Sequence, residues 1–270
     1  MAMKQLYIYQ IHYDDASRAI LDPAFIPLEN ANNERPDWRE YWSMRKFLLS
    51  HELDDEAYYG FLSPKFQLKT GLSGEDVRAF VEARDADVYI LSPYVEQSTF
   101  FLNIFEQGEA NHPGFQHAMQ QFVAAVGLPP TLYQSVCDLS NSIYSNYFLA
   151  KPVFWRQWLH IGEALFAIAE SGEGELAAAL NGAAKYHENV GAVGFKVFLM
   201  ERLATVVLLL NQYTTAAYDP FLLTRTGIPA SYLDHEMRIA NALKMAFIRT
   251  SDARYIESFI QFRSQVMASL

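Results

Sequence analysis

The chain has 270 residues, of which 51% are apolar, and its 31 acidic and 21 basic residues give a formal charge of −10. This acidity argues against general nucleic-acid binding, which needs a basic face. The single cysteine, Cys137, excludes an internal disulfide and a cysteine-cluster metal site. No apolar run reaches the roughly 18 residues of a membrane span. The N-terminus lacks a signal-peptide layout, so we expect a cytoplasmic protein.

The first 62 residues predict two strands and one helix. Residues 6–13 are rich in Tyr and Ile and read as a strand, and residues 57–62 read as a second, buried strand. Residues 22–37 hold three prolines and three asparagines, which predicts a long irregular loop of the kind that often serves function. A helix is expected at 37–50.

Alternation of the two element types continues to about residue 150. Ser73, with Asp76 three residues on, predicts the capped start of a helix. Residues 87–91 form a short apolar strand, 115–126 have helical spacing, and 143–149 read as another strand.

Helices dominate the rest of the chain. Pro152 suits a first helical position, and the helix that it opens should end near Gly172. Residues 195–210 predict a buried helix, and two more are expected from 231 to the C-terminus. We therefore expect one α/β domain spanning 1–270, with a core at 1–150 and a helix-rich part at 151–270 that completes it.

A first group of candidate binding residues lies in the loop and helix between Asn30 and Arg45. Arginine forks bind phosphate oxygens in pairs, and the neighbouring tryptophans can stack on a base or sugar. The alternative is a surface helix packed by its aromatic residues. The candidates in this group are Asn33, Arg35, Asp37 and Arg39.

Two lysines follow the strand at 57–62. Lys65 comes directly after the Ser63-Pro64 break, and Lys69 lies four residues further on. Together they can offset the charge of a diphosphate without a metal, although solvated lysines at an ordinary turn are the alternative. The glycines nearby do not match a Gly-rich phosphate-binding loop.

Candidate acid–base residues follow in a Gly- and Pro-containing stretch. Glu106, Glu109 and His112 lie within seven residues, and a carboxylate or imidazole can take a proton from a hydroxyl. A polar connection between helices is the alternative. Further on, the adjacent Glu201 and Arg202 in an apolar helix suggest a buried ion pair, unless the arginine reaches a ligand.

Several short blocks in this order resemble bacterial surface-polysaccharide glycosyltransferases with a GT-A-like fold. The resemblance runs from about Tyr58 to Leu210. The blocks are Tyr59-Gly60-Phe61-Leu62, Asp87-Val88-Tyr89-Ile90-Leu91, Phe105-Glu106-Gln107 with His112, Asn146-Tyr147-Phe148-Leu149-Ala150-Lys151, and Gly194-Phe195 with Glu201-Arg202-Leu203. In the turn, Ser63-Pro64-Lys65 replaces the His-Tyr-Arg-Arg run of those proteins.

The resemblance implies a Rossmann-type mixed sheet flanked by helices, and a sugar donor bound at the carboxyl ends of its strands. Asp14 and segment 33–39 would line the donor pocket, and Lys65 and Lys69 would offset the leaving diphosphate. Asn146 and Lys151 would close the other wall. Glu106 or Glu109 would act as the base, with His112 nearby.

The expected activity is transfer of a sugar from a nucleotide sugar to a glycan hydroxyl during synthesis of O-antigen or capsule. The acceptor would be a glycan or lipid-linked glycan, handled at the inner face of the membrane beside membrane-bound assembly machinery. No Asp-x-Asp follows a strand in mid-sheet, so no metal site is predicted, with Mg²⁺ or Mn²⁺ as an alternative. Other open readings are a phosphoribosyl pyrophosphate donor and a non-catalytic carbohydrate-binding subunit.

Overall fold

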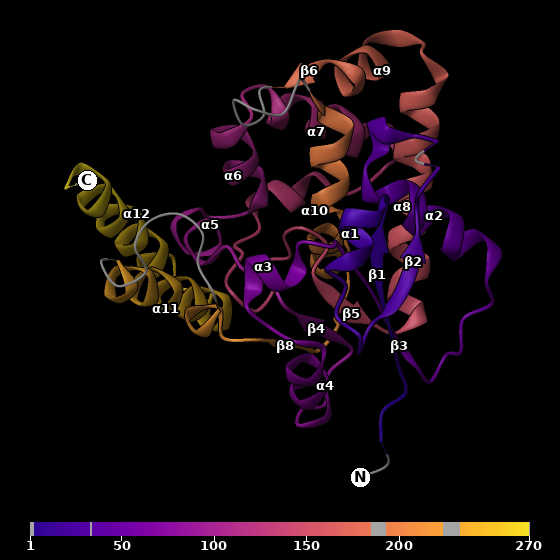
Figure 1. Cartoon of the computed structure of the whole chain (residues 1–270). Helices are drawn as coiled ribbons and strands as arrows, with labels where there is room; N and C mark the ends of the chain where they lie inside the picture. Colours follow the sequence, from indigo (N-terminus) through magenta and orange to yellow (C-terminus); the bar gives the residue numbers. More distant parts are fainter. Residues whose placement is uncertain (1–2, 33, 185–192, 224–232, 270) are drawn as a thin grey trace.

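A mixed six-stranded sheet forms the centre of the protein, with helices on both faces (Figure 1). The computed structural model describes residues 3–32, 34–184, 193–223 and 233–269. This architecture confirms the expected α/β class with a mixed sheet flanked by helices.

The strand order is β2-β1-β3-β5-β4-β8. β1 is parallel to β2 and β3, β8 is parallel to β4, and β5 runs antiparallel to both β3 and β4. A separate two-stranded sheet pairs β6 with β7. The strands are β1 (Leu6–His12), β2 (Ile26–Glu29), β3 (Tyr58–Leu62), β4 (Val88–Ile90), β5 (Phe148–Ala150), β6 (Ala183–Ala184), β7 (Val193–Gly194) and β8 (Thr215–Ala217).

Strand β3 shows how the two faces are filled, because its side chains alternate between them. Tyr59 and Phe61 belong to the larger core, which contains residues of α2 (Glu40–Ser50), α7 (Phe115–Ala125), α8 (Pro152–Ser171) and α10 (Phe195–Leu210). Tyr58 and Leu62 belong to a second core with α3 (Phe66–Thr70) and α4 (Gly74–Glu82). All five residues of β3 are buried.

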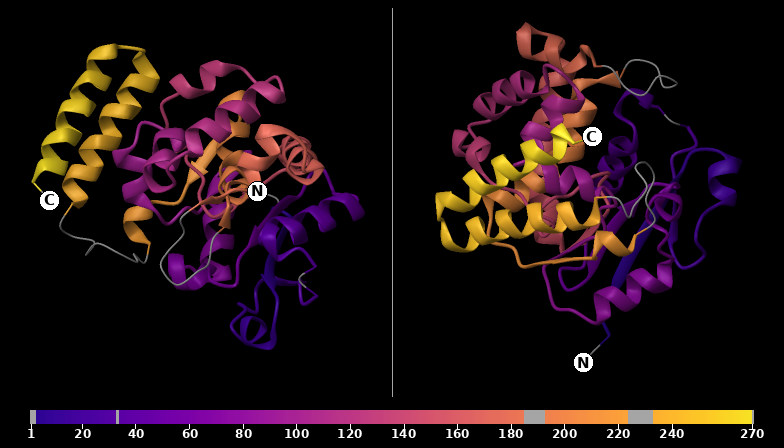
Figure 2. Two further views of the ribbon diagram at one scale, coloured as in Figure 1. Left: turned by 90° about the horizontal axis from the view of Figure 1, so that it is seen from above. Right: turned by 90° about the vertical axis from the view of Figure 1, so that its left-hand side faces the viewer.

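The two C-terminal helices, α11 (Asp234–Thr250) and α12 (Ala253–Ala268), form a hairpin at one side of the molecule (Figure 2). They share a third apolar cluster with α5 (Val95–Phe100). The buried Lys244 ammonium donates to the carbonyls of Ser98 and Phe101 at 2.5 and 2.7 Å, which ties the hairpin to the main body. The remaining elements are α1 (Asp15–Ala19), η1 (Pro36–Trp38), α6 (Ile104–Asn111), η2 (Pro130–Gln134), α9 (Gly174–Asn181) and η3 (Pro220–Leu222).

Most predicted elements are present near their expected positions, including the Ser73–Asp76 capping box. Two predictions need correction. The strand expected at 143–149 begins only at Phe148, because residues 144–147 form a turn. The loop expected at 22–37 contains β2 and η1. In the described part of the chain, no helix is both long and apolar enough to cross a membrane.

Candidate functional site

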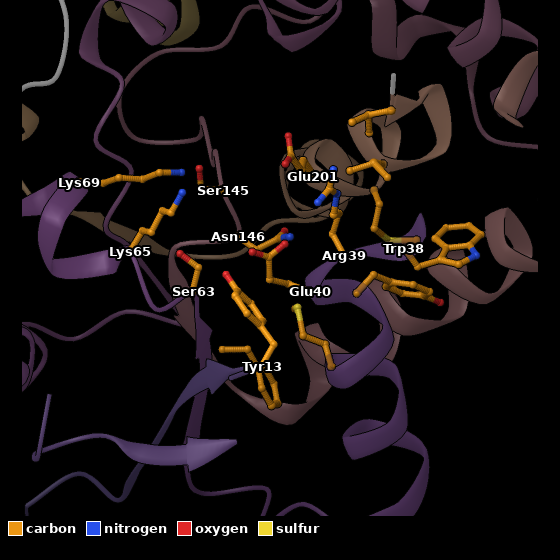
Figure 3. Close-up of a pocket in the computed structure, with 16 residues that line it drawn as sticks. Tyr13, Trp38, Arg39, Glu40, Ser63, Lys65, Lys69, Ser145, Asn146 and Glu201 are labelled. Carbon is orange, nitrogen blue, oxygen red and sulfur yellow. The ribbon is translucent and has the colours of Figure 1, made fainter. Parts of the chain in front are cut away.

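A cavity of about 260 Å³ opens at the end of the sheet where strands β1 and β3 have their carboxyl ends (Figure 3). Tyr13 reaches it from the end of β1, and Ser63 and Lys65 reach it from the end of β3. Ser145 and Asn146 come from the segment that precedes β5. Because β5 is antiparallel to β3, the first residue of β5 lies at the same end of the sheet as the last residue of β3.

At this end of the sheet, the connections from neighbouring strands run in opposite directions across the sheet. It leaves β1 for β2 on one side, and it leaves β3 for β4 on the other side, beyond β5. In open α/β sheets, ligands bind outside the carboxyl ends of the strands where the connections diverge in this way. The cavity therefore lies where this topology places a ligand.

Two helices of the larger core complete the walls. Arg39, which precedes α2, and Glu40 and Met44 in its first turns reach the cavity, while α10 brings Met200 and Glu201. The site thus joins residues that lie about 190 positions apart in the sequence, from Tyr13 to Glu201.

The cavity gathers five charged side chains: Arg39, Glu40, Lys65, Lys69 and Glu201. No residue in the described ranges forms an ion pair with any of them. Figure 3 shows the two lysine side chains reaching in from one side, with the arginine and the two carboxylates across from them. Charges held together without partners are typical of a site that receives a charged ligand.

Electrostatics distinguish Glu201 from an ordinary surface carboxylate. Burial raises the pKa of Glu201, and the nearby Glu40 carboxylate raises it further, against the opposing effect of Arg202, Lys69 and Arg39. A carboxyl with a raised pKa is suited to accept a proton near neutral pH. Glu201 is therefore the better general-base candidate of the two carboxylates.

Lys69 lies between aromatic rings. Its ammonium is 5.6 Å from the ring centroid of Tyr147 and 5.8 Å from that of Tyr94. Burial alone would lower the pKa of Lys69, but Tyr147, Tyr94 and the Glu201 carboxylate together outweigh it and the net shift is upward. The cavity therefore keeps a positive charge at this position.

The backbone is strained at the same place. Four non-glycine residues of the described chain have positive φ, and three of them, Arg39 (51°), Ser145 (58°) and Asn146 (55°), line this cavity. Such conformations cost of the order of 1–3 kcal/mol each and gather at functional sites. Their concentration here supports a ligand-binding role.

Ser145 and Asn146 are the central residues of a tight turn. The Tyr147 N–H donates to the Tyr144 carbonyl at 3.2 Å, and the Tyr147 hydroxyl lies 2.6 Å from Ser63 Oγ, which connects the turn to the end of β3. Asn146 is only 7% exposed, and its Oδ1 has no hydrogen-bond partner among the described residues. A buried amide oxygen without a partner is costly unless a ligand or water supplies one.

Four residues proposed from the sequence meet in this cavity: Arg39, Lys65, Lys69 and Asn146. Glu40, Ser145 and Glu201 also line the cavity but were not proposed as site residues from the sequence, although Glu40 directly follows the candidate Arg39. The structure shows no ion pair between the described residues Glu201 and Arg202, contrary to expectation, because adjacent helical residues face different directions. Arg202 instead donates to Gln107 Oε1 at 2.6 Å.

Four other proposed donor-site residues do not line the cavity. Asp14 caps α1 by accepting from Ser17 N at 2.7 Å, and the Arg35 guanidinium donates to Asp37 at 2.8 and 3.0 Å. Lys151 follows β5 whereas Asn146 precedes it, so the two residues lie at opposite ends of this strand. The remaining proposed donor-site residue, Asn33, lies outside the described residues.

The three proposed acid–base residues also lie outside the cavity and have structural partners. Glu106 accepts from Arg263 at 2.8 Å and from Leu102 N at 2.5 Å. Glu109 accepts from the backbone N–H groups of Gly114 and Gln116 at 3.0 and 2.8 Å, at the start of α7. The His112 ring stacks on Phe198 with centroids 3.7 Å apart. The structure does not bring these three residues together with the two lysines.

Comparisons of the chain with models of protein families, with curated proteins and with solved structures give no match. Within the described ranges, no group of three or more His, Cys, Asp or Glu residues is arranged to hold a metal ion.

Proposed function

We propose that this chain is a glycosyltransferase with a GT-A-like fold, which moves a sugar from a diphosphate-activated donor to a glycan hydroxyl. The observation that carries the proposal is the meeting of Lys65 and Lys69 with unpaired carboxylates at the carboxyl ends of β1 and β3. The parallel strands β2, β1 and β3 beside the antiparallel β5 support the GT-A-like assignment.

The lysines stabilise the leaving group in this proposal. When the bond between the anomeric carbon and the diphosphate oxygen breaks, the oxygen keeps the electron pair and negative charge develops on it. Two ammonium groups placed at that oxygen stabilise the charge. The same chemistry suits a nucleoside diphosphate sugar or phosphoribosyl pyrophosphate, since both carry a diphosphate on the anomeric carbon.

Glu201 is the proposed base. The acceptor hydroxyl oxygen forms the new bond to the anomeric carbon, and its proton passes to the Glu201 carboxylate. This assignment replaces Glu106 and Glu109, which serve other contacts, by the cavity carboxylate whose pKa is raised. The acceptor class, a glycan or lipid-linked glycan of O-antigen or capsule synthesis at the inner membrane face, comes from the resemblance alone.

Titration calorimetry with inorganic pyrophosphate and UDP tests the lysine role. Lys65→Ala and Lys69→Ala should each weaken binding by about 10- to 100-fold, the usual range for one charged hydrogen bond. Lys46→Ala, which removes an exposed lysine paired with Glu34, is the matched control. Unchanged affinity in both cavity variants would contradict the proposal.

Sugar-transfer assays across a donor panel, with and without Mg²⁺ or Mn²⁺, test the chemistry. Glu201→Gln should lower kcat far more than Glu106→Gln. A larger loss of kcat in Glu106→Gln than in Glu201→Gln would identify Glu106 as the base instead. Glycan binding without turnover for any donor would favour a non-catalytic carbohydrate-binding subunit.

A further inference from the structure

Two side chains of the cavity, Asn146 and Glu40, have no direct contact with the leaving diphosphate or the acceptor proton in the chemistry described above. The Asn146 amide and the Glu40 carboxylate point into the same region, between the lysines on one side and Arg39 on the other (Figure 3). Neither the Glu40 carboxylate nor Asn146 Oδ1 has a hydrogen-bond partner within the described residues. Both groups are polar, and the amide is buried.

From this arrangement we infer that Glu40 and Asn146 form a sugar subsite, which binds hydroxyl groups of the donor sugar and so selects the donor. The inference rests on the proposed function. A sugar joined to a diphosphate at Lys65 and Lys69 would extend from the lysines toward these two side chains.

The chemistry of the two groups favours hydroxyls. A carboxylate can only accept hydrogen bonds, so its ligand must donate. A half turn of the amide exchanges its oxygen and its N–H₂ group, so Asn146 can present either end. A hydroxyl both donates and accepts, and is therefore the group that satisfies both side chains whichever end of the amide faces it.

The backbone holds the amide in place. Asn146 has a φ of 55° in the turn before β5, and that turn is fixed by the contact between Tyr147 and Ser63. Asn tolerates this left-handed conformation better than most residues, but glycine tolerates it best. A functional amide explains why the more stable glycine does not occupy a position that favours it.

Glycine therefore provides a clean test. Asn146→Gly removes the amide without straining the backbone, so the variant should fold at least as well as the wild type. Ser251→Gly is the matched control, because Ser251 has a φ of 57° in the turn between α11 and α12, outside the cavity. Glu40→Gln removes the charge and keeps the size of the side chain.

The measurement is calorimetric affinity for UDP-glucose, GDP-mannose and dTDP-glucose, each beside its nucleoside diphosphate without sugar. For the donor that the wild type binds best, Asn146→Gly should weaken binding by about 5- to 30-fold, the loss expected for one or two hydrogen bonds. Glu40→Gln should weaken it at least as much. Asn146→Gly should not change the affinity for the free nucleoside diphosphate, and Ser251→Gly should change nothing. Glu40→Gln should leave that affinity unchanged or raise it, because it removes a negative charge from the cavity that holds the diphosphate.

Two results overturn the sugar subsite. One is a wild type that binds no sugar donor more tightly than the matching diphosphate. The other is an Asn146→Gly variant that weakens both equally, or neither. If Lys65→Ala still weakens UDP binding in that case, the diphosphate site stands and only the sugar subsite fails. If Lys65→Ala has no effect either, the proposed function fails with it.

Discussion

The Lys196 ammonium lies 2.5 Å from the Asp37 carboxylate, and this pair joins the first turn of α10 to η1. Arg35 donates to the same carboxylate and to Glu170 on α8. The cluster thus connects η1, α8 and α10, and Asp37 precedes Arg39 by only two residues. The cluster holds Arg39 and Glu40 opposite Glu201 without entering the cavity.

Asp37→Asn should reduce stability by about 1 kcal/mol, because it leaves the buried Lys196 ammonium with only the Glu170 carboxylate, 3.9 Å away. Partial exposure of Asp37 screens the pair and keeps the loss small. Burial alone would raise the pKa of Asp37, but hydrogen bonds from Arg35 and Lys196 lower it from 3.8 to about 2. The stabilisation is therefore complete above pH 3.8 and is lost as the pH falls toward about 2.

Urea unfolding at several pH values measures this effect. The difference in the free energy of unfolding between wild type and Asp37→Asn should shrink as the pH falls from 3.8 toward about 2. Asp55→Asn is the control, since Asp55 forms an exposed pair with Arg156 and should matter little. A gap that does not change with pH would rule out the carboxylate charge as its cause.

Arg39→Gly should stabilise the protein and weaken ligand binding. Arg39 has φ 51° and ψ −137°, a conformation that glycine adopts without strain. Relief of that strain should add about 1 kcal/mol to the free energy of unfolding. Pyrophosphate affinity should fall because a cavity cation is lost. Thermal unfolding and calorimetry on one sample check both effects, and a destabilised Arg39→Gly variant would contradict the strain.

Glu201→Gln should stabilise the protein at neutral pH. Because the pKa of Glu201 is raised in the folded state, that state binds a proton more tightly than the unfolded chain does. The wild type therefore loses stability as the pH rises from the ordinary pKa of 4.5 through the raised value. Unfolding free energies should diverge in favour of the Gln variant over that range. Parallel curves for the two proteins would argue against the raised pKa.

Gly60→Ala should destabilise the sheet by about 1–3 kcal/mol, the usual cost of overpacking a core. A Cβ at Gly60 would lie 2.9 Å from Leu149 Cγ and 3.2 Å from the Phe148 carbonyl on β5. The double variant Gly60→Ala/Leu149→Ala should lose less than the sum of the two single changes. Additive losses, measured by urea unfolding, would show that Leu149 is not what the new methyl group meets.

Local patterns in the sequence were enough to predict most elements. Short-range rules decide where Ser73 caps α4 and where Pro152 begins α8, because capping and proline geometry depend on a few neighbouring residues. The strand expected at 143–149 failed for the opposite reason. Its apolar residues fit a strand, but the tertiary contact between Tyr147 and Ser63 accompanies a turn there.

The site shows the same division. The sequence by itself determined that Lys65 and Lys69 follow a buried strand, and that strand-end position brought both to the cavity. Only the tertiary structure decided which carboxylates meet them. Glu106 and Glu201 each lie on a helix near apolar residues, and no feature of the neighbouring sequence shows which of them faces a cavity. Packing of α12 gives Glu106 the Arg263 partner, while packing of α10 against the sheet leaves Glu201 facing the cavity.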